Sequence, residues 1–297
     1  MAETRRLSEL VSATLPRLDL PEGPVEVALS GGADSATLAY LSIEGGLEVR
    51  ALHIDHQLPA SPMLAGAAGE VAGRLGIELE VRQVDLAKGP SPEEQAREAR
   101  YAVLVDRGLP VLTGHTRDDS IETMLINLIR GTGPTGLTGI PGFRRPNIYR
   151  PMLAVTRSET REIATLAGLP FVDDPMNEDL SLTRNRIRLG LLPLMRELNP
   201  QVDAALARTA ATLERDREYL ERRAAKHFGP TLPVSAVTTL PPALADRVLR
   251  HALEESGIAP TSDRIARMWS VASGESERQE LAEGRVVVKR GALLIIE

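Results

Sequence analysis

The sequence predicts an α/β protein with a doubly wound parallel sheet, followed by a long helix and a small α+β C-terminal domain. Short apolar runs alternate with helical segments through the first half of the chain, which is typical of a parallel sheet covered by helices. One long helical pattern follows Pro200, and the composition changes after Gly229-Pro230. We therefore expect a large domain over residues 1–215, a linking helix at about 200–228 and a small domain over 229–297.

Four strands and four helices are expected to alternate before residue 131. The strands are the apolar runs at 25–29, 47–54, 77–84 and 110–113. The helices are 34–41, a segment that begins at Ser61-Pro62, a segment that begins at Ser91, and 120–130. Ser61 and Pro62 are a capping residue and a first-turn proline, and Ser91 has Glu94 at the spacing of a capping box. Ligands of such sheets bind beyond the carboxyl ends of the strands, so we expect the site there.

The second half is expected to be mainly helical. Residues 131–142 form a glycine-rich loop, and Thr156-x-x-Glu159 begins a helix that ends at Gly168. The long helix after Pro200 runs to about His227, because apolar residues recur at helical spacing along one face. Helices at 242–255 and 263–273 then precede strands at 285–288 and 293–296.

Composition excludes several kinds of chemistry. The 297 residues include no cysteine, which excludes disulfides, thiolate zinc sites, cysteine-held iron–sulfur clusters and persulfide chemistry on the protein. No apolar stretch approaches the ~18 residues of a membrane span. The start, Met1 to Arg6, leads into a polar segment without an apolar signal region. We therefore expect a cytoplasmic protein with no membrane partner.

The distribution of charge is more informative than its sum. The net charge of −6 argues mildly against a nucleic-acid partner. Residues 127–161, however, carry six arginines against one acidic residue, and residues 181–223 carry nine arginines against six. Such a basic region either binds nucleic-acid phosphates or is an ordinary solvated face, and charge alone leaves both readings open.

The segment Ser30-Gly31-Gly32-Ala33-Asp34-Ser35 follows the first strand and opens the first helix. Its glycines let backbone N–H groups turn inward and the helix N-terminus adds partial positive charge, so this turn suits phosphate. Ser30 and Ser35 can donate hydroxyl hydrogen bonds as well. A carboxylate beside phosphate is repelled unless it holds a magnesium ion, which is the role we expect of Asp34. The alternative is that Asp34 only caps the helix.

Polar residues also end the second strand, at His53-Ile54-Asp55-His56. This edge of the sheet lies next to the phosphate loop, where these residues could bracket an adenosine. A metal site and ordinary strand-end polarity are the alternatives.

A second polar segment, Gly114-His115 to Glu122-Thr123, follows the fourth strand and opens a helix. A separation of three or four residues places Asp118 or Asp119 on the same helix face as Glu122. Carboxylates grouped in this way can bind magnesium, hold a cationic substrate or act as a general base. Asp118, Asp119 and Ser120 are also expected to cap the helix, but capping explains neither His115 nor Glu122.

The motif Ser-Gly-Gly-x-Asp-Ser resembles the PP-loop signature of ATP pyrophosphatases, which implies cleavage of ATP between its α and β phosphates. Five segments within residues 22–200 together resemble the tRNA(Ile)-lysidine synthetase family. They are the PP-loop; His53-x-Asp55-His56; Ala96-Arg97-x-x-Arg100-Tyr101; residues 114–137; and Asp173-Asp174-Pro175-x-Asn177 with Arg184-Asn185-x-Ile187-Arg188 and Leu192-Pro193. Each segment alone is weak, whereas the combination is specific.

The resemblance implies ATP and Mg²⁺ as cofactors, and free L-lysine and tRNA(Ile) with a CAU anticodon as partners. In that family the ring carbonyl oxygen of the wobble cytidine attacks ATP, and lysine then displaces AMP. The implied catalytic residues are Asp34, Arg97, Asp119, Glu122 and Arg188, and the implied lysine-binding residues are Asp118, Asp119 and Glu122. Nucleotide binding is implied for Ser30, Gly31, Gly32, Ala33, Asp34, Ser35, His53, Asp55 and His115, with magnesium on Asp34. tRNA binding is expected of Arg130, Arg144, Arg145, Arg184, Arg186 and Arg208.

Two departures from the family pattern are present. Gln57 and Pro59 stand where the family usually has glycine and arginine, which leaves the details of the adenosine pocket open. The tail is short, so we expect the compact form of the enzyme, in which the module after about residue 230 discriminates the tRNA. The oligomeric state stays open, a homodimer included.

Three rival functions are less consistent with these residues. A tRNA thiolase and an amidating synthetase of the same superfamily commonly use cysteine, which this chain lacks. A non-catalytic adenine-nucleotide sensor needs a phosphate loop but has no use for Asp34 together with the His115–Glu122 cluster.

Overall fold

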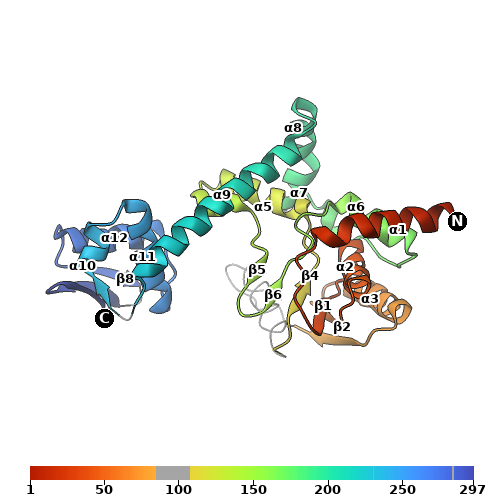
Figure 1. The fold of residues 1–297 in the computed structure, drawn as a ribbon, viewed down its shortest axis with the longest axis horizontal. Helices are drawn as coiled ribbons and strands as arrows, with labels where there is room; N and C mark the ends of the chain where they lie inside the picture. The colour runs from red at the N-terminus through yellow and green to blue at the C-terminus, as the bar shows by residue number, and fades with distance from the viewer. Residues whose placement is uncertain (85–107, 230, 283) are drawn as a thin grey trace. The chain divides into compact units, whose positions relative to one another are not determined.

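The computed structural model describes residues 1–84, 108–229, 231–282 and 284–297. The chain forms two compact units, Met1–Ala210 and Ala211–Glu297. Their boundary falls inside the long helix α9 (Val202–Ala224), drawn in green-blue in Figure 1. Within the described ranges, no helix is both long and apolar enough to cross a membrane.

Unit 1 is built on a six-stranded sheet in the order β3-β2-β1-β4-β6-β5. The strands are β1 (Val25–Ala28), β2 (Val49–Asp55), β3 (Leu79–Gln83), β4 (Val111–Thr113), β5 (Phe143–Arg144) and β6 (Ile148–Tyr149). Neighbouring strands run parallel except β5, which is antiparallel to β6. This arrangement confirms the predicted fold class. The strand order reverses between β1 and β4, and open α/β sheets bind ligands at such a switch point.

Helices α1 (Ala2–Thr14), α2 (Ala33–Glu44), α3 (Ser61–Leu75) and α6 (Arg157–Leu166) share one main core with the sheet. Helix α5 (Arg117–Ile129), the π-helical turn η4 (Ile187–Leu191) and α8 (Leu192–Leu198) form a second, smaller core, and α7 (Thr183–Arg186) contacts α5 and η4. Val27 of β1, Leu38 of α2 and Ile163 of α6 are fully buried in the main core. Small aliphatic residues fill this interior because only 3 % of the chain is aromatic. The core therefore fixes the ends of β1 and β4, where the candidate site lies.

Unit 2 contains a four-stranded antiparallel sheet in the order β7-β10-β9-β8. Its strands are β7 (Leu232–Pro233), β8 (Arg278–Ala282), β9 (Arg285–Arg290) and β10 (Leu293–Ile296), and its helices are α10 (Val234–Thr238), α11 (Pro242–Glu255) and α12 (Ser262–Ser273). Leu249, Met268 and Val287 are fully buried in its own core. This unit confirms the predicted small α+β domain.

Some local expectations need correction. Ser61 does not cap α3, because it is the first helical residue and Ala60 is the N-cap, without a side-chain hydrogen bond. Ser61 Oγ instead accepts a hydrogen bond from the N–H of Leu58 (3.0 Å), so it stabilises the preceding turn. The helix expected from Ser91, with its Ser91–Glu94 capping box, lies outside the described residues.

Candidate active site

The glycine-rich loop connects β1 to α2 at the sheet switch point. The N–H of Ser30 donates to Ser35 Oγ (3.0 Å), and the Ser35 hydroxyl lies 2.9 Å from the carbonyl oxygen of Gly32, to which it donates. Gly31 has φ +88°, and a Cβ atom there would lie 2.4 Å from the carbonyl oxygen of Leu64 in α3. Only glycine satisfies both conditions. The loop therefore has the compact form and the helix N-terminus that a phosphate cradle requires.

Gly114 brings the end of β4 against this loop. A Cβ atom on Gly114 would lie 3.0 Å from the backbone nitrogen of Ser35 and 3.1 Å from the carbonyl carbon of Asp34. The next residue, His115, has its Nδ1 atom 2.9 Å from Thr113 Oγ1. Two motifs that lie far apart in the sequence thus meet backbone to backbone.

Helix α5 carries the acidic motif, and its cap differs from the expected one. Thr116 is the N-cap, and Asp119 Oδ2 accepts hydrogen bonds from both the N–H and the hydroxyl of Thr116, each at 2.8 Å. The helix therefore begins at Arg117, three residues before the predicted Ser120. Asp118 Oδ2 accepts from the N–H of Arg157 at the start of α6 (2.9 Å). Asp119 takes part in the cap, as expected. The caps expected from Asp118 and Ser120 were wrong, because Asp118 accepts from α6 and Ser120 Oγ accepts from the N–H of Ile140 (3.1 Å).

Arg157 joins the acidic motif to the phosphate loop. Its guanidinium donates to Asp119 Oδ1 (2.8 Å) and Glu122 Oε1 (3.1 Å), and its Nε lies 3.7 Å from Asp34 Oδ2. Burial opposes the charge of Arg157, but the carboxylates of Asp119, Glu122 and Asp34 outweigh it and raise the pKa of Arg157. Arg157 is therefore a permanently charged group in contact with both motifs.

Thr160, one turn further along α6, orients Asp34. Its fully buried hydroxyl donates to Asp34 Oδ1. Burial raises the pKa of Asp34 to about 6, and the charges of Asp119 and Asp118 add to the rise, while Thr160 and Arg157 oppose it. Asp34 is thus a carboxylate whose negative charge is incompletely compensated, which favours an added cation.

Glu122 is fully buried and held by arginines from the α7–η4 segment. Arg188 forms a bidentate pair with it, Nε to Oε1 at 2.7 Å and Nη2 to Oε2 at 3.0 Å. Arg184 Nε lies 3.7 Å from Oε2. A buried carboxylate is strongly destabilising unless it has such partners. Arg196 of α8 similarly lies 3.6 Å from Asp118.

The pKa of Asp119 reflects this network. Burial opposes ionisation of Asp119, but the charge of Arg157 and the hydrogen bonds from Thr116 outweigh it and hold the pKa below its ordinary value. Asp119 is therefore an ionised acceptor, suited to binding a cation.

His53 and Asp55 end β2, the strand next to β1. His53 is buried, and its Nδ1 donates to the carbonyl oxygen of Leu29 just before the phosphate loop (2.8 Å). Asp55 Oδ1 accepts from the N–H of Gln57 (2.7 Å), and Gln57 has φ +55°. A positive φ is the backbone conformation that favours glycine. The departure at Gln57 therefore keeps the conformation that glycine would adopt.

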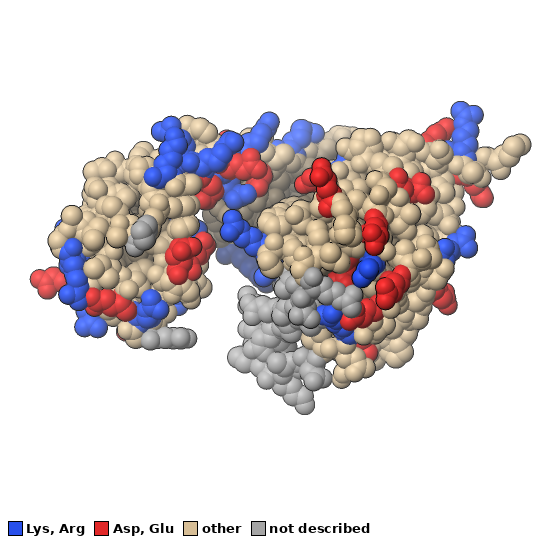
Figure 2. All heavy atoms as spheres, turned by 60° about the horizontal axis from the view of Figure 1, so that its bottom comes forward, with Lys and Arg blue, Asp and Glu red and all other residues tan. Residues whose placement is uncertain are grey.

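The arginines expected to bind tRNA lie on separate elements of unit 1. Arg130 follows α5, Arg144 and the exposed Arg145 lie at β5, Arg184 and Arg186 are in α7, and Arg208 is exposed on α9. Figure 2 shows basic and acidic side chains interspersed on the face drawn. Arg184 differs from the other arginines expected to bind tRNA in that it contacts α5. Its Nε lies 3.7 Å from Glu122 Oε2, and its Nη2 donates to Thr123 Oγ1 (3.0 Å). Arg97, with the segment Ala96 to Tyr101, lies outside the described residues.

A magnesium ion fits the site only together with a nucleotide. Within residues 1–84, 108–229, 231–282 and 284–297, no group of three or more His, Cys, Asp or Glu residues is arranged to hold a metal ion. Mg²⁺ is commonly bound by one or two carboxylates and the phosphates of a nucleotide. Asp34, beside the glycine loop and with an incompletely compensated charge, fits that requirement.

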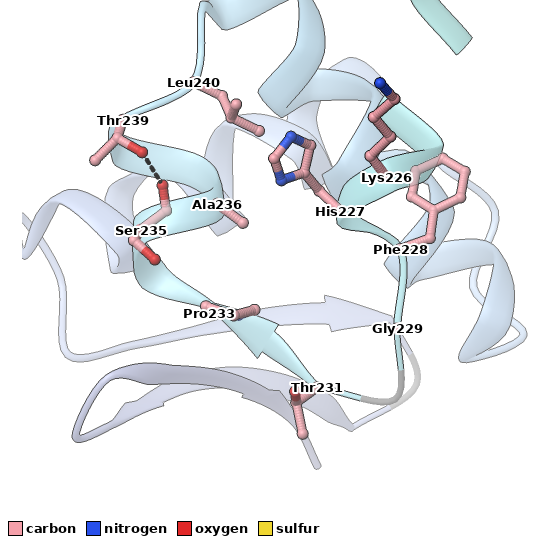
Figure 3. A pocket seen from close by; sticks show the side chains of 10 residues that line it. All are labelled: Lys226, His227, Phe228, Gly229, Thr231, Pro233, Ser235, Ala236, Thr239 and Leu240. Carbon is pink, nitrogen blue, oxygen red and sulfur yellow. Dashed lines mark hydrogen bonds between the residues drawn. The ribbon is translucent and has the colours of Figure 1, made fainter. Parts of the chain in front are cut away.

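A second concave feature lies in unit 2, where residues 226–229 meet β7 and α10 (Figure 3). It encloses about 440 Å³. Lys226 and His227 line it together with Thr231 and Ser235, and the Thr239 hydroxyl donates to the carbonyl oxygen of Ser235 (2.6 Å). Phe228, Pro233, Ala236 and Leu240 also line it, so the lining is mixed, with one lysine among polar and apolar groups.

Both units match known protein families. Residues 3–195 match the PP-loop domain, and residues 232–293 match the TilS substrate binding domain. The solved U34-tRNA thiolase NcsA from Methanococcus maripaludis has a similar fold, with a TM-score of 0.56 and 19 % identity, over 72 % of this chain and 80 % of the thiolase.

Curated relatives have the same name across several bacteria. The tRNA(Ile)-lysidine synthase of Rhodococcus erythropolis is 37 % identical over 294 residues, which cover 93 % of this chain and 90 % of the relative. That of Salinispora tropica is 39 % identical over 268 residues, covering 82 % of this chain and 80 % of the relative. That of Thermus thermophilus is 34 % identical over 295 residues, and this chain spans 57 % of its length.

Proposed function

Because this chain belongs to the tRNA(Ile)-lysidine synthase family of PP-loop proteins, we propose that it joins free L-lysine to the wobble cytidine of a tRNA(Ile) with a CAU anticodon. The observation that carries the proposal is the meeting of two motifs at the sheet switch point. Gly114 brings the acidic motif against the phosphate loop, and Arg157 contacts carboxylates of both. A nucleotide and a cationic amino acid can therefore be held side by side.

The proposed reaction has two steps. The ring carbonyl oxygen of cytidine attacks the α phosphorus of ATP, the bond to the β phosphate breaks, and pyrophosphate leaves. The amine of lysine then attacks the ring carbon that carries this oxygen, and AMP leaves with the former carbonyl oxygen. Adenylation makes this substitution feasible because AMP is a far better leaving group than a carbonyl oxygen.

The glycine loop is assigned to the triphosphate. Backbone N–H groups of residues 30–35 and the N-terminus of α2 would bind the leaving pyrophosphate. Mg²⁺, held by Asp34 and the phosphates, would neutralise the charge that develops there. Thr160 positions Asp34 for this role, because its hydroxyl fixes one carboxylate oxygen. His53, Asp55 and His115 are assigned to the edges of the nucleotide site, and Arg97 remains a candidate for phosphate contact on the sequence alone.

The acidic motif is assigned to lysine. Asp119, with its lowered pKa, supplies an ionised acceptor for the ammonium group, and Asp118 lies beside it. Glu122 is fully buried and paired with Arg188, so its contribution is to hold the arginines and the cluster in place. A proton must leave the ammonium before attack, and the neighbouring carboxylates are the acceptors available in the described site.

The tRNA is assigned to the basic residues of unit 1 and to unit 2. Arg130, Arg145 and Arg208 are exposed and can contact backbone phosphates, which contributes affinity without sequence information. In unit 2, the hollow beside Lys226 and His227 has the cation and hydroxyl groups that suit an RNA backbone. We assign selection of the tRNA to unit 2.

The test is incorporation of labelled lysine into tRNA. The protein is incubated with ATP, Mg²⁺, labelled lysine and a tRNA(Ile) transcript bearing CAU, and label is expected in the tRNA together with AMP and pyrophosphate. Asp34→Asn, which keeps the shape of the side chain, is expected to abolish pyrophosphate release. The matched control is Asp19→Asn, which changes an exposed carboxylate of unit 1 outside the assigned sites and should leave the rate unchanged. ATP binding without label in the RNA would favour the sensor, and label from a sulfur or ammonia donor would favour another PP-loop enzyme.

A further inference from the structure

Arg157 is shared between two sites that the proposed function assigns to different substrates. Its Nη2 lies 2.8 Å from Asp119 Oδ1 and its Nη1 lies 3.1 Å from Glu122 Oε1, both on the lysine side. Its Nε lies 3.7 Å from Asp34 Oδ2, on the nucleotide side. One guanidinium cannot keep all these contacts and also pair with a triphosphate and leave room for a lysine ammonium. Binding of either ligand is therefore expected to favour movement of this guanidinium away from Asp119.

The carboxylates on the lysine side already have cationic partners. Asp119 is 2.8 Å from Arg157, and Glu122 contacts Arg157 and Arg188 at 3.1 and 2.7 Å. A lysine ammonium gains little from carboxylates that are already paired. It gains much more if one guanidinium turns to another anion, because a partly buried carboxylate then lacks its cation.

We propose that Arg157 couples the two sites by changing partner: a triphosphate in the glycine loop takes its guanidinium, and Asp119 Oδ1 becomes the acceptor for the lysine ammonium. Nucleotide then strengthens lysine binding, and by thermodynamic linkage lysine strengthens nucleotide binding to the same degree. This inference rests on the proposed function, because it takes the two ligands from it.

The contacts single out Arg157 for this exchange. Arg188 holds Glu122 through a bidentate pair at 2.7 and 3.0 Å and lies 3.8 Å from Asp119. No contact of Arg188 with Asp34 is present among the described ion pairs, whereas Arg157 reaches that carboxylate. Arg188 can therefore stay with Glu122 while Arg157 moves.

Asp119 is the carboxylate that the exchange leaves available. Its Oδ2 atom accepts two hydrogen bonds from Thr116 at 2.8 Å each, so its orientation does not depend on Arg157. Its Oδ1 atom has Arg157 at 2.8 Å, and the next cation, Arg188, is 3.8 Å away. Departure of Arg157 thus exposes one preoriented oxygen at the place where the lysine ammonium would bind.

The experiment measures lysine affinity by isothermal titration calorimetry on the full chain, with Mg²⁺ alone and with Mg²⁺ plus α,β-methylene-ATP, which cannot be cleaved at that bond. In the unmodified protein the nucleotide is expected to lower the Kd for lysine about tenfold, within the usual range of coupling. In Arg157→Gln, lysine is expected to bind more tightly than to the unmodified protein when only Mg²⁺ is present. Addition of the nucleotide to Arg157→Gln should then change the Kd for lysine by less than about twofold.

A purely structural role for Arg157 predicts a different result. Loss of a scaffold would weaken lysine binding in both conditions, and that outcome would overturn the proposal. The control Arg6→Gln removes an exposed ion pair between α1 and Glu162 of α6, the helix that carries Arg157. This variant should retain the full coupling. If Arg157→Gln does not fold, Arg157→Lys carries the test, because an ammonium keeps the charge but cannot bridge Asp119 and Glu122 as a planar guanidinium does. Its coupling should fall to about threefold, and undiminished coupling would contradict the proposal.

The unmodified protein distinguishes this inference from the proposed function. If it modifies tRNA but binds lysine equally well with and without the nucleotide, only the coupling is overturned. If it neither binds lysine nor modifies tRNA, the proposed function fails and the coupling fails with it.

Discussion

Replacement of Gly31 by alanine tests how closely the phosphate loop packs against α3. Gly31 has φ +88°, and an added Cβ atom would lie 2.4 Å from the carbonyl oxygen of Leu64. Two controls separate the causes. Gly46 has a similar φ of +83° with nothing within 4 Å of its Cβ position, whereas Gly32 has φ −90° and its nearest neighbour would be Ser30 Oγ at 3.6 Å.

The magnitudes follow from these distances. A non-glycine residue in left-handed backbone costs about 1–2 kcal/mol, which is the whole expected effect of Gly46→Ala. Real Cβ contacts are essentially never shorter than 3.0 Å, so Gly31→Ala must also displace the loop or the start of α3. Overpacking of this kind typically costs about 1–3 kcal/mol. We expect Gly31→Ala to destabilise unit 1 by about 2–5 kcal/mol and Gly32→Ala by less than about 1 kcal/mol.

The assay is urea unfolding followed by far-UV circular dichroism, together with ATP binding by calorimetry. The difference between Gly31→Ala and Gly46→Ala isolates the collision with Leu64. ATP affinity should fall at least about tenfold in Gly31→Ala, which corresponds to about 1.4 kcal/mol, and should be unchanged in Gly46→Ala, which lies outside the loop. Equal destabilisation of the two variants, within about 0.5 kcal/mol, would refute the close approach of loop and helix.

Four further predictions concern charge. Asp34 has its pKa raised to about 6, so Mg²⁺-dependent ATP binding should weaken as pH falls below about 6; an unchanged Kd at pH 5 would contradict its role as a ligand. Glu159 has its pKa lowered to about 2, because Arg17 and the N–H of Thr156 outweigh the opposing effect of burial. Glu159→Gln should therefore destabilise the protein by about 1 kcal/mol at pH 7. The difference in unfolding free energy between the two proteins should vanish as pH falls from 4.5 toward 2, as measured by urea unfolding at several pH values. Arg188→Ala should cost about 3–5 kcal/mol in unfolding free energy because it removes the bidentate partner of the buried Glu122, and a loss below about 1 kcal/mol would show that this pair is dispensable. Arg145→Gln should reduce the dependence of log Kd for tRNA on log salt by about one unit, equally for cognate and non-cognate tRNA, whereas an effect confined to one tRNA would indicate base-specific contact.

Local patterns in the sequence were sufficient for the fold class and for most of the elements. Apolar runs of strand length alternate with helical periodicity, and the Thr156–Glu159 capping box is present as predicted. Strand β8 was missed because the only buried apolar residue in Arg278–Ala282 is Leu281, too little for a periodic signal. Helix α1 was missed in the same way, since it buries only Val11 and Thr14.

The sequence by itself determined which chemical groups gather at the sheet edge. The Ser30–Ser35 loop, Asp118, Asp119 and Glu122 each follow a strand, and parallel strands place their carboxyl ends together. Only the tertiary structure decided how these groups are connected. Neither Arg157 nor Thr160 directly follows a strand, and the capping box that spans Arg157 predicts only the start of a helix. Both nevertheless contact residues 35 to 126 positions away. The close approach of Gly31 to Leu64 is equally invisible in sequence, because periodicity and capping report interactions within a few residues, whereas packing between helices depends on the whole fold.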